Sequence, residues 1–296
     1  MSPDTQNSTV AEQDAASVGT LLANAIRDIG IPPCPAILIQ INTEMSKDVP
    51  DLKYLDRVIS SDVSLAAGLI AIANSPFFGF RNRVRSVREA LQMLGLVVAS
   101  RTIAGLIIQK VFPPSPSLER FWHASACIAR LSGWLAQHCR AGLKVRPDDA
   151  YTFGLFRDCG IPILMRRFDD YAETLKRANG EQERGFTEIE QISHPTNHAA
   201  VGSLLAQSWW LPDETCLAIR HHHDRPLAPC QGLQTAALGL IAIVQLAEHL
   251  FQHHSGLSQT QEWHKLGPDC LRLLKLEEAD LEALYVDCAE LASNQG

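Results

Sequence analysis

Apolar residues recur at three- and four-residue intervals along most of this chain, and this spacing favours amphipathic α-helices. Alternation with a period of two, which is typical of strands, is missing. Within "LKYLDRVISSDVSLAAGLIAIANS" the apolar positions are Leu52, Leu55, Ile59, Leu65, Leu69 and Ile72. The sequence therefore predicts an all-α fold, and a hydrophobic share of 46% is enough for an ordinary globular core.

Capping residues mark where some of these helices should begin. Ser61 or Asp62 precedes one apolar repeat, and either side chain could accept hydrogen bonds from the first free amides of a helix. Ser86 is followed three residues later by Glu89, which is the spacing of a capping box.

Three prolines in "VFPPSPSLERFW", at positions 113, 114 and 116, must interrupt any helix. They divide a predicted first helical bundle, 18–112, from a second one, 117–254. The polar stretch "HHSGLSQTQEW" then leads into a C-terminal helical extension, 255–296. The polar residues 1–17 are expected to be disordered. The chain is thus expected to form two packed helical bundles, together 18–254.

The charge balance limits the partners. A net charge of −7 argues against broad binding to nucleic acid or to an anionic membrane. The Arg-rich stretch "FRNRVRSVRE", 80–89, is the one local basic patch. The N-terminus lacks the basic and apolar regions of a signal peptide. The apolar stretch 233–250 looks too short for a membrane span, since it ends in Glu248 and His249. We expect a cytoplasmic protein without a membrane partner.

The spacing and surroundings of the cysteines are consistent with a cytoplasmic location. None of the eight belongs to a CxxC pair, and most lie in apolar, helix-like surroundings. They are predicted to be reduced core residues of a cytosolic protein.

Potential metal ligands occur in four separate segments of the second bundle. The segments carry His123; Asp158 beside Arg157; His194 and His198; and the run His221, His222, His223 and Asp224. Imidazole and carboxylate are the usual ligands of zinc, iron and manganese, so convergence would build a metal site. The alternative is ordinary: each histidine is satisfied by hydrogen bonds, and the histidine run suits the negative end of a helix dipole.

The segment "YTFGLFRDCGIPIL" places Arg157 and Asp158 in the middle of an apolar helix. Burying an unpaired charge costs several kcal/mol, so the guanidinium must find an anion. We expect Arg157 to be buried and paired with a carboxylate.

Several stretches together resemble the HDOD family, bacterial regulatory domains related to the HD superfamily of metal phosphohydrolases. "IPPCPAILIQI", 31–41, is similar to the start of that family. "ISSDVSLAAGLIAIANSPFFGFRNRVRSVREALQMLGL", 59–96, carries its most specific pattern. "FWHASACIA", "GLFRDCGIPIL", "HAAVGSLLAQSWWLP" and "AIRHHHD" are similar to its later half. The resemblance covers about 20–255, and it implies that the second bundle is a degenerate HD domain.

The resemblance also implies an altered metal site. In the catalytic relatives, Arg157 is replaced by a histidine that binds metal together with the residue at Asp158, and Glu248 is usually an aspartate. A guanidinium has no lone pair to offer a metal. The vestigial site would comprise His123, Arg157, Asp158, His198, His221, His222 and Glu248. Within this site the candidate anions for Arg157 are Asp158 and Glu248. No cofactor is expected, although His123, Asp158, His198 and His222 could still hold one divalent metal weakly.

This loss implies a non-catalytic signal-transduction module that acts through other signalling proteins. Arg81, Arg83 and Arg85 are candidates for contacting a partner, because arginine is enriched at binding hot spots. The neighbouring Phe77, Phe78 and Phe80 fit core packing better.

Three alternatives remain at this point. A residual metal-dependent phosphohydrolase would act on a nucleotide or cyclic dinucleotide, with Arg157 facing phosphate. However, "HHHD" is not followed by the Gly-Tyr-Pro signature of cyclic-dinucleotide-cleaving relatives. Nucleic-acid binding lacks a basic face. A nucleophilic Cys159 is disfavoured because Asp158 beside it opposes a thiolate.

Overall fold

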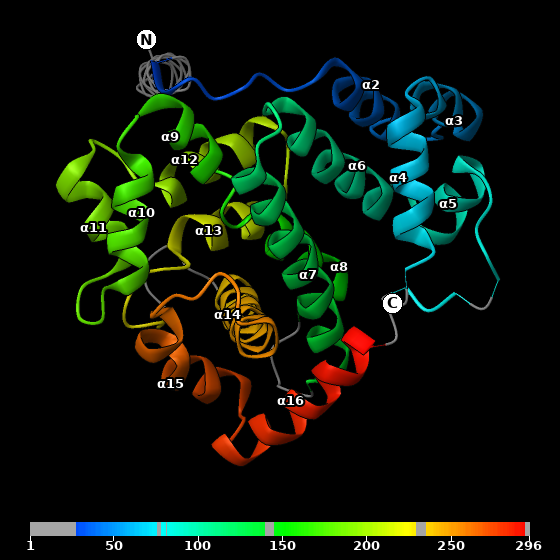
Figure 1. Ribbon diagram of the computed structural model, residues 1–296. Coiled ribbons are helices and arrows are strands. Elements are labelled where there is room, and N and C mark those ends of the chain that lie inside the picture. The colour runs from blue at the N-terminus through cyan, green and yellow to red at the C-terminus, as the bar shows by residue number, and fades with distance from the viewer. Residues whose placement is uncertain (1–27, 76–77, 81, 140–144, 229–234, 294–296) are drawn as a thin grey trace, which may run out of the picture.

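The computed structural model describes residues 28–75, 78–80, 82–139, 145–228 and 235–293. Within these ranges the regular structure is helical and contains no strand, which confirms the all-α prediction. The helices form two packed bundles followed by a C-terminal pair (Figure 1). The predicted tail, 1–17, lies outside the described residues.

The first bundle contains α2 (Ala36–Met45), α3 (Leu52–Ser60), α4 (Val63–Ala73), α5 (Val87–Leu94) and α6 (Leu96–Val111). The second contains α7 (Pro116–His138), α8 (Pro147–Phe156), α9 (Ile161–Arg167), α10 (Tyr171–Gly180), α11 (Phe186–Ser193), α12 (His198–Ser208), α13 (Asp213–His221) and α14 (Thr235–Ser255). The C-terminal pair is α15 (Glu262–Leu274) and α16 (Glu278–Ser293). The interruption between α6 and α7 coincides with the proline-rich stretch.

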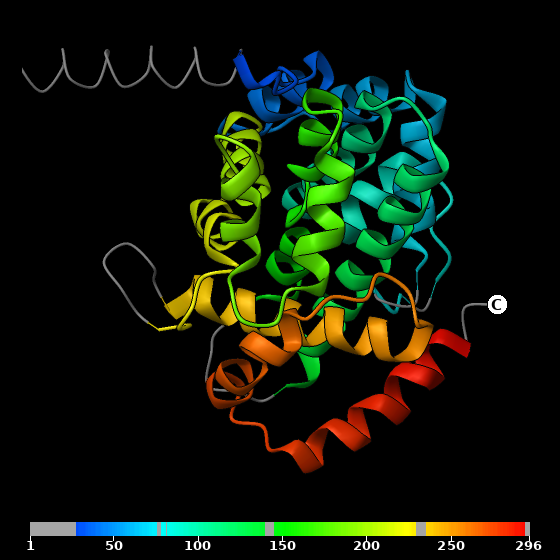
Figure 2. The ribbon, with the colours of Figure 1, turned by 60° about the vertical axis from the view of Figure 1, so that its left-hand side comes forward.

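Helix α14 is the longest apolar helix among the described residues, and it lies at the centre of the second bundle. Figure 2 shows α15 and α16 on the side of α14 that faces away from the first bundle. The sequence prediction that this segment is too short for a membrane span is wrong on length. The helix continues past Glu248 to Ser255, and its 21 residues are long and apolar enough to cross a membrane. However, 78% of its most apolar window is buried inside the protein, as in a core helix.

Side-chain caps start several helices of the first bundle. Asp62, and not Ser61, caps α4: its Oδ1 accepts hydrogen bonds from the amides of Ser64 at 3.0 Å and Leu65 at 3.1 Å. Ser86 Oγ accepts from the Glu89 amide at 3.1 Å, while the Glu89 carboxylate turns back to the Arg85 amide at 2.7 Å. The predicted capping box is therefore present in a form shifted by one residue.

Asp62 also joins α4 to α6, because Lys110 Nζ lies 2.8 Å from its Oδ2. We expect Asp62→Ala to lower the free energy of unfolding by about 1 kcal/mol, since a cap is lost. Lys110→Ala removes only an exposed ion pair and should cost less, about 0.2–0.5 kcal/mol, the low end for exposed pairs. Urea unfolding of both variants measures the difference. Equal losses would show that the ion pair, and not the cap, is what stabilises this corner.

The stability that the Asp62 carboxylate contributes should depend on pH. The hydrogen bond from Lys110, followed by the Leu65 amide, lowers the pKa of Asp62 to about 2. A carboxyl with a depressed folded-state pKa stabilises the protein above its unfolded pKa of about 3.9 and loses this contribution as the pH falls through the folded value. The stability gap between wild type and Asp62→Ala should therefore narrow as the pH is lowered from about 4 towards 2. A constant gap over that range would contradict the assignment.

Candidate metal centre

The turn between α8 and α9 carries the charged pair seen in the sequence. Arg157 is the C-cap residue of α8, Asp158 follows in the turn, and Gly160 precedes α9. Gly160 packs against the first turn of α12, where a Cβ added to it would lie 2.1 Å from the His198 carbonyl oxygen. The missing side chain at Gly160 thus allows the backbone that carries Asp158 to approach the backbone that carries His198.

Arg157 is buried, with 4% of its surface exposed, and its guanidinium bridges two carboxylates. Its Nη2 lies 3.0 Å from Asp158 Oδ2 and 3.2 Å from Glu248 Oε1, which is on α14. Its Nη1 donates to the Gly154 carbonyl at 3.0 Å. This confirms the prediction that Arg157 is buried and paired, and both candidate anions take part.

Three histidines meet on the other side of Asp158. His198 begins α12, and His222 and His223 leave the end of α13. His198 Nε2 lies 3.3 Å from His222 Nε2 and 3.2 Å from His223 Nε2. Asp158 Oδ1 lies 3.5 Å from His198 Nε2 and 3.4 Å from His222 Nε2. One carboxylate oxygen and three ring nitrogens therefore face a common point.

The opposite nitrogen of each ring has an acceptor. His198 Nδ1 lies 2.8 Å from Glu190 Oε2, and His223 Nδ1 lies 2.5 Å from Glu262 Oε2. His222 Nδ1 lies 2.8 Å from the Ile219 carbonyl oxygen, one of the free acceptors at the end of α13. A carboxylate or carbonyl oxygen cannot donate, so each Nδ1 carries a proton, and a ring in its neutral form turns an Nε2 lone pair inward. Metal-binding histidines are typically held in this way.

The packing fixes the rings in these orientations. All three are buried, with exposures of 0%, 1% and 7% for His198, His222 and His223. Phe186 of α11 stacks on the His223 ring, with centroids 4.6 Å apart. Glu190, which orients His198 and also accepts from the His198 amide at 3.1 Å, receives a further hydrogen bond from Tyr171. Inward lone pairs at these separations repel each other unless a proton or a metal ion lies between them.

The spacing of the four atoms fits one metal ion. Zinc binds imidazole nitrogen at about 2.0–2.1 Å, and a tetrahedron of that radius has edges of about 3.3–3.4 Å. Four of the six edges run from 3.2 to 3.5 Å, and the two from His223 Nε2 to His222 and to Asp158 are at most 4.8 Å. Asp158, His198, His222 and His223 are thus the residues that would hold the ion, and all their candidate ligand atoms lie within 4.8 Å of one another.

The surrounding charges favour anionic Asp158. Burial opposes its ionisation, but the Arg157 charge and contacts with the histidines outweigh burial and lower the pKa of this carboxyl. Burial likewise opposes protonation of His198, yet Glu190 raises the pKa of that ring. Burial, together with His222 and His198, lowers the pKa of His223. At Glu248 burial exceeds the attraction of Arg157 and raises the carboxyl pKa. The cluster therefore combines one strongly acidic carboxylate with imidazoles held close to it.

Not every predicted residue reaches this cluster. His123 is exposed on α7, because Trp122 and Ala124 take the buried positions beside it. It lies near Cys127, with Nε2 and Sγ 3.8 Å apart, and lines a separate cavity of about 530 Å³ with Phe251. The structure does not bring His123 to Asp158, so the ligand set that included it is not assembled.

The histidine run divides into two roles. His221 is the last residue of α13 and pairs with Asp224 Oδ2 at 2.6 Å near the surface. His222 and His223 lie beyond the helix, where successive side chains are free of its 100° rotation and both turn inward. Sequence reasoning named His223 in the run of potential ligands but left it out of the vestigial site, although the end of the helix at this run was a usable signal. His194 is buried elsewhere, with its Nε2 3.1 Å from Thr174 Oγ1.

The Arg-rich stretch of the first bundle is at the surface. Arg83 and Arg85 are exposed, whereas Arg81 and Phe77 lie outside the described residues. Phe78 and Phe80 are half-buried and stack on each other with centroids 5.9 Å apart, and both pack against the core. The phenylalanines thus serve packing, and the two described arginines face solvent.

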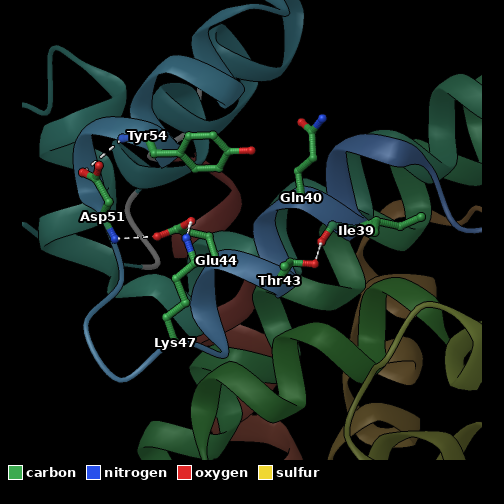
Figure 3. Close-up of a pocket in the computed structure, with 7 residues that line it drawn as sticks. All are labelled: Ile39, Gln40, Thr43, Glu44, Lys47, Asp51 and Tyr54. Carbon is green, nitrogen blue, oxygen red and sulfur yellow. Dashed lines mark hydrogen bonds and ion pairs between the residues drawn. The ribbon is translucent and has the colours of Figure 1, made fainter.

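A second cavity, of about 370 Å³, lies between α2 and α3 (Figure 3). Its charged groups pair with one another: Glu44 contacts Lys47 Nζ at 2.5 Å and accepts from the Asp51 amide at 2.8 Å. The Tyr54 ring lies 6.0 Å from Lys47 Nζ. We assign no ligand to this cavity.

A family model and several solved structures show what this chain is similar to. The family model of the HDOD domain matches residues 31–225. A "Putative phosphohydrolase" from Shewanella amazonensis SB2B superimposes with a TM-score of 0.65 and 18% identity, covering 90% of this chain and 93% of that one. An HDOD domain protein of unknown function from Geobacter sulfurreducens gives a TM-score of 0.59 and 21% identity, covering 92% and 97%. At such identities the likeness shows the fold alone.

Two further relatives are longer than this chain. A "Putative signal transduction protein" from Marinobacter aquaeolei VT8 gives a TM-score of 0.60 and 22% identity, covering 91% of this chain but 58% of that one. An uncharacterized protein of Treponema pallidum (strain Nichols) is 26% identical over 216 residues, which are 71% of this chain and 41% of the relative. This chain therefore spans about two fifths of the length of that curated relative.

Proposed function

Because this chain belongs to the HDOD domain family, we propose that it is a non-catalytic regulatory module of bacterial, cytoplasmic signal transduction. Its partners would be other signalling proteins. Arg83 and Arg85 are exposed and are available for such a contact. Its HD-like site would hold a single divalent metal in a structural role and would not turn over a phosphate ester.

The observation that carries this proposal is the guanidinium of Arg157 between Asp158 and Glu248. Hydrolysis by a two-metal site needs two cations about 3.5–4 Å apart, which together bind the attacking and leaving oxygens. Here a permanent organic cation pairs with the two carboxylates that a second ion would need. It cannot act as a ligand, and its charge repels a divalent neighbour.

The remaining donors support a structural role for a first ion. Structural zinc sites are closed by four protein ligands, whereas catalytic sites keep one position open for water or substrate. Asp158, His198, His222 and His223 supply four donors, and the three rings are buried. When bound, the ion would cross-link the end of α8, the start of α12 and the end of α13.

Metal and activity assays on the full chain test the proposal. We expect about one zinc per chain and no phosphodiesterase or nucleotidase turnover with Mn²⁺, Fe²⁺, Mg²⁺ or Zn²⁺. His198→Ala should lose the zinc, because a central donor is removed. His123→Ala is the matched control and should retain it, since His123 lies outside the cluster. Turnover that disappears in Asp158→Ala would overturn the proposal in favour of a residual phosphohydrolase.

Arg157→His provides a second test. The substitution replaces the guanidinium by a neutral donor beside Asp158 and Glu248, and so it should raise the bound metal above one equivalent per chain. Elemental analysis after dialysis measures this directly. An unchanged content of one equivalent would mean that Asp158, Glu248 and residue 157 cannot form a second site.

A further inference from the structure

The third histidine of the cluster is oriented from outside the region that matches the family. His223 Nδ1 lies 2.5 Å from Glu262 Oε2, and Glu262 is the first residue of α15. The family match ends at residue 225, so the C-terminal pair contributes a residue that the family region does not contain. The site thus joins two parts of the chain.

Glu262 is held firmly on the α15 side. It is buried, with 2% of its surface exposed, and it pairs with Lys265 one turn later on the same helix. The Lys265 side chain is itself 1% exposed, and its Nζ donates to the Arg184 carbonyl at 3.2 Å. A buried carboxylate supported in this way differs from a solvated surface acid, because moving it would strand two charges. Docking of α15 and the orientation of His223 are therefore one structural arrangement.

We propose that metal binding at the four-residue cluster and docking of α15 are coupled through the His223–Glu262 hydrogen bond. This rests on the single-metal site proposed above. A cation on Nε2 polarises the imidazole, which strengthens the hydrogen bond that Nδ1 donates to a carboxylate. The two equilibria are linked and change each other by the same factor. If docking of α15 through Glu262 raises the affinity for the metal by some factor, then bound metal raises the docking equilibrium constant of α15 by that factor.

Through this coupling, binding or loss of the metal would change how firmly α15 is docked, without any catalysis. Besides Glu262, α15 is held by contacts that do not involve the cluster. The Trp263 ring stacks on His249 of α14 with centroids 4.4 Å apart, and Asp269 Oδ2 accepts from the Leu227 amide at 3.0 Å. Loss of the metal would weaken the His223–Glu262 hydrogen bond and leave these two contacts unchanged. It would favour states in which the face of α14 beneath α15 is uncovered.

The test compares zinc affinity with hydrogen exchange in α15, using zinc alone as the ligand and the full chain. Replacing a residue that hydrogen-bonds to a metal ligand typically costs about 10–100-fold in metal affinity, so Glu262→Gln should weaken zinc binding by that amount. In the wild type, zinc should slow exchange of the α15 amides by a similar factor. Glu262→Gln should remove this zinc-dependent protection. Asp269→Asn is the matched control, an acid on α15 without contact to the cluster, and should keep both effects.

The outcomes separate the two proposals. If wild-type zinc binding leaves exchange in α15 unchanged, or if Glu262→Gln keeps wild-type affinity and protection, the coupling is wrong while the metal site stands. If the wild type binds no zinc, both fail. The wild-type measurement requires no variant, so it remains decisive even if Glu262→Gln disturbs folding. His198→Ala with added zinc should show the same α15 exchange as the zinc-free wild type.

Discussion

Arg157→Ala is expected to lower the free energy of unfolding by about 3–5 kcal/mol, because it leaves the carboxylates of Asp158 and Glu248 buried without their cation. The guanidinium that would be removed lies 3.0 Å from one carboxylate and 3.2 Å from the other. It also donates to the Gly154 carbonyl at the end of α8. Urea unfolding of metal-free protein, with chelator present, measures this cost without a contribution from bound metal.

The exposed Arg85 provides the control for Arg157. Arg85→Ala should change stability by about 0.5 kcal/mol or less, as surface substitutions usually do. A double variant, Arg157→Met with Glu248→Leu, should recover part of the loss, because replacing both members of a buried pair costs less than removing one. Equal small effects of Arg157→Ala and Arg85→Ala would show that Arg157 is solvated in solution and free to contact a phosphate.

Gly160→Ala should be comparably disruptive for a steric reason. The new Cβ would lie 2.1 Å from the His198 carbonyl oxygen and 2.9 Å from the Gly202 nitrogen, and both are backbone atoms that cannot rotate away. Overpacking of this kind costs about 1–3 kcal/mol or more. The backbone of α12 must shift to relieve the contact, and His198 moves with it. We therefore expect loss of stability together with weaker zinc binding.

Gly180 is the matched glycine for this experiment. It ends α10, and apart from its chain neighbours and the backbone of its own helix no heavy atom lies within 4 Å of a Cβ built on it. Gly180→Ala should be neutral or stabilising by up to about 1 kcal/mol, since it reduces the entropy of the unfolded chain. Thermal unfolding and a zinc titration on both variants make the comparison. If Gly160→Ala unfolds and binds zinc like wild type, α9 and α12 do not approach as closely as described.

Local rules were sufficient for the fold class and for the state of Arg157. Helical periodicity and the absence of strand alternation predicted the all-α architecture, and the cost of burying an unpaired charge predicted that Arg157 pairs with a carboxylate. Glu248 became a candidate only through the family resemblance. Both arguments depend on residues close in sequence or on a general energetic rule. Neither requires knowledge of how the helices pack.

The composition of the cluster depended on packing, and there the sequence was less informative. Whether His123 or His223 joins Asp158 is decided by which face of α7 is covered and by where α13 ends. The residues that orient the rings were not predicted at all. Glu190 and Glu262 lie in other helices, and Glu262 is separated from His223 by 39 positions. No local pattern marks a carboxylate whose partner is brought to it only by tertiary structure.

The position of Glu248 and Glu262 beyond residue 225 affects how this protein should be divided for experiments. A fragment that ends at the family boundary would lack α14 and α15. Arg157 would lose one of its two anions, and His223 would lose the acceptor that holds its proton on Nδ1. A recombinant piece cut there would misreport both stability and metal content. The smallest fragment that can represent the site has to extend at least to the end of α15.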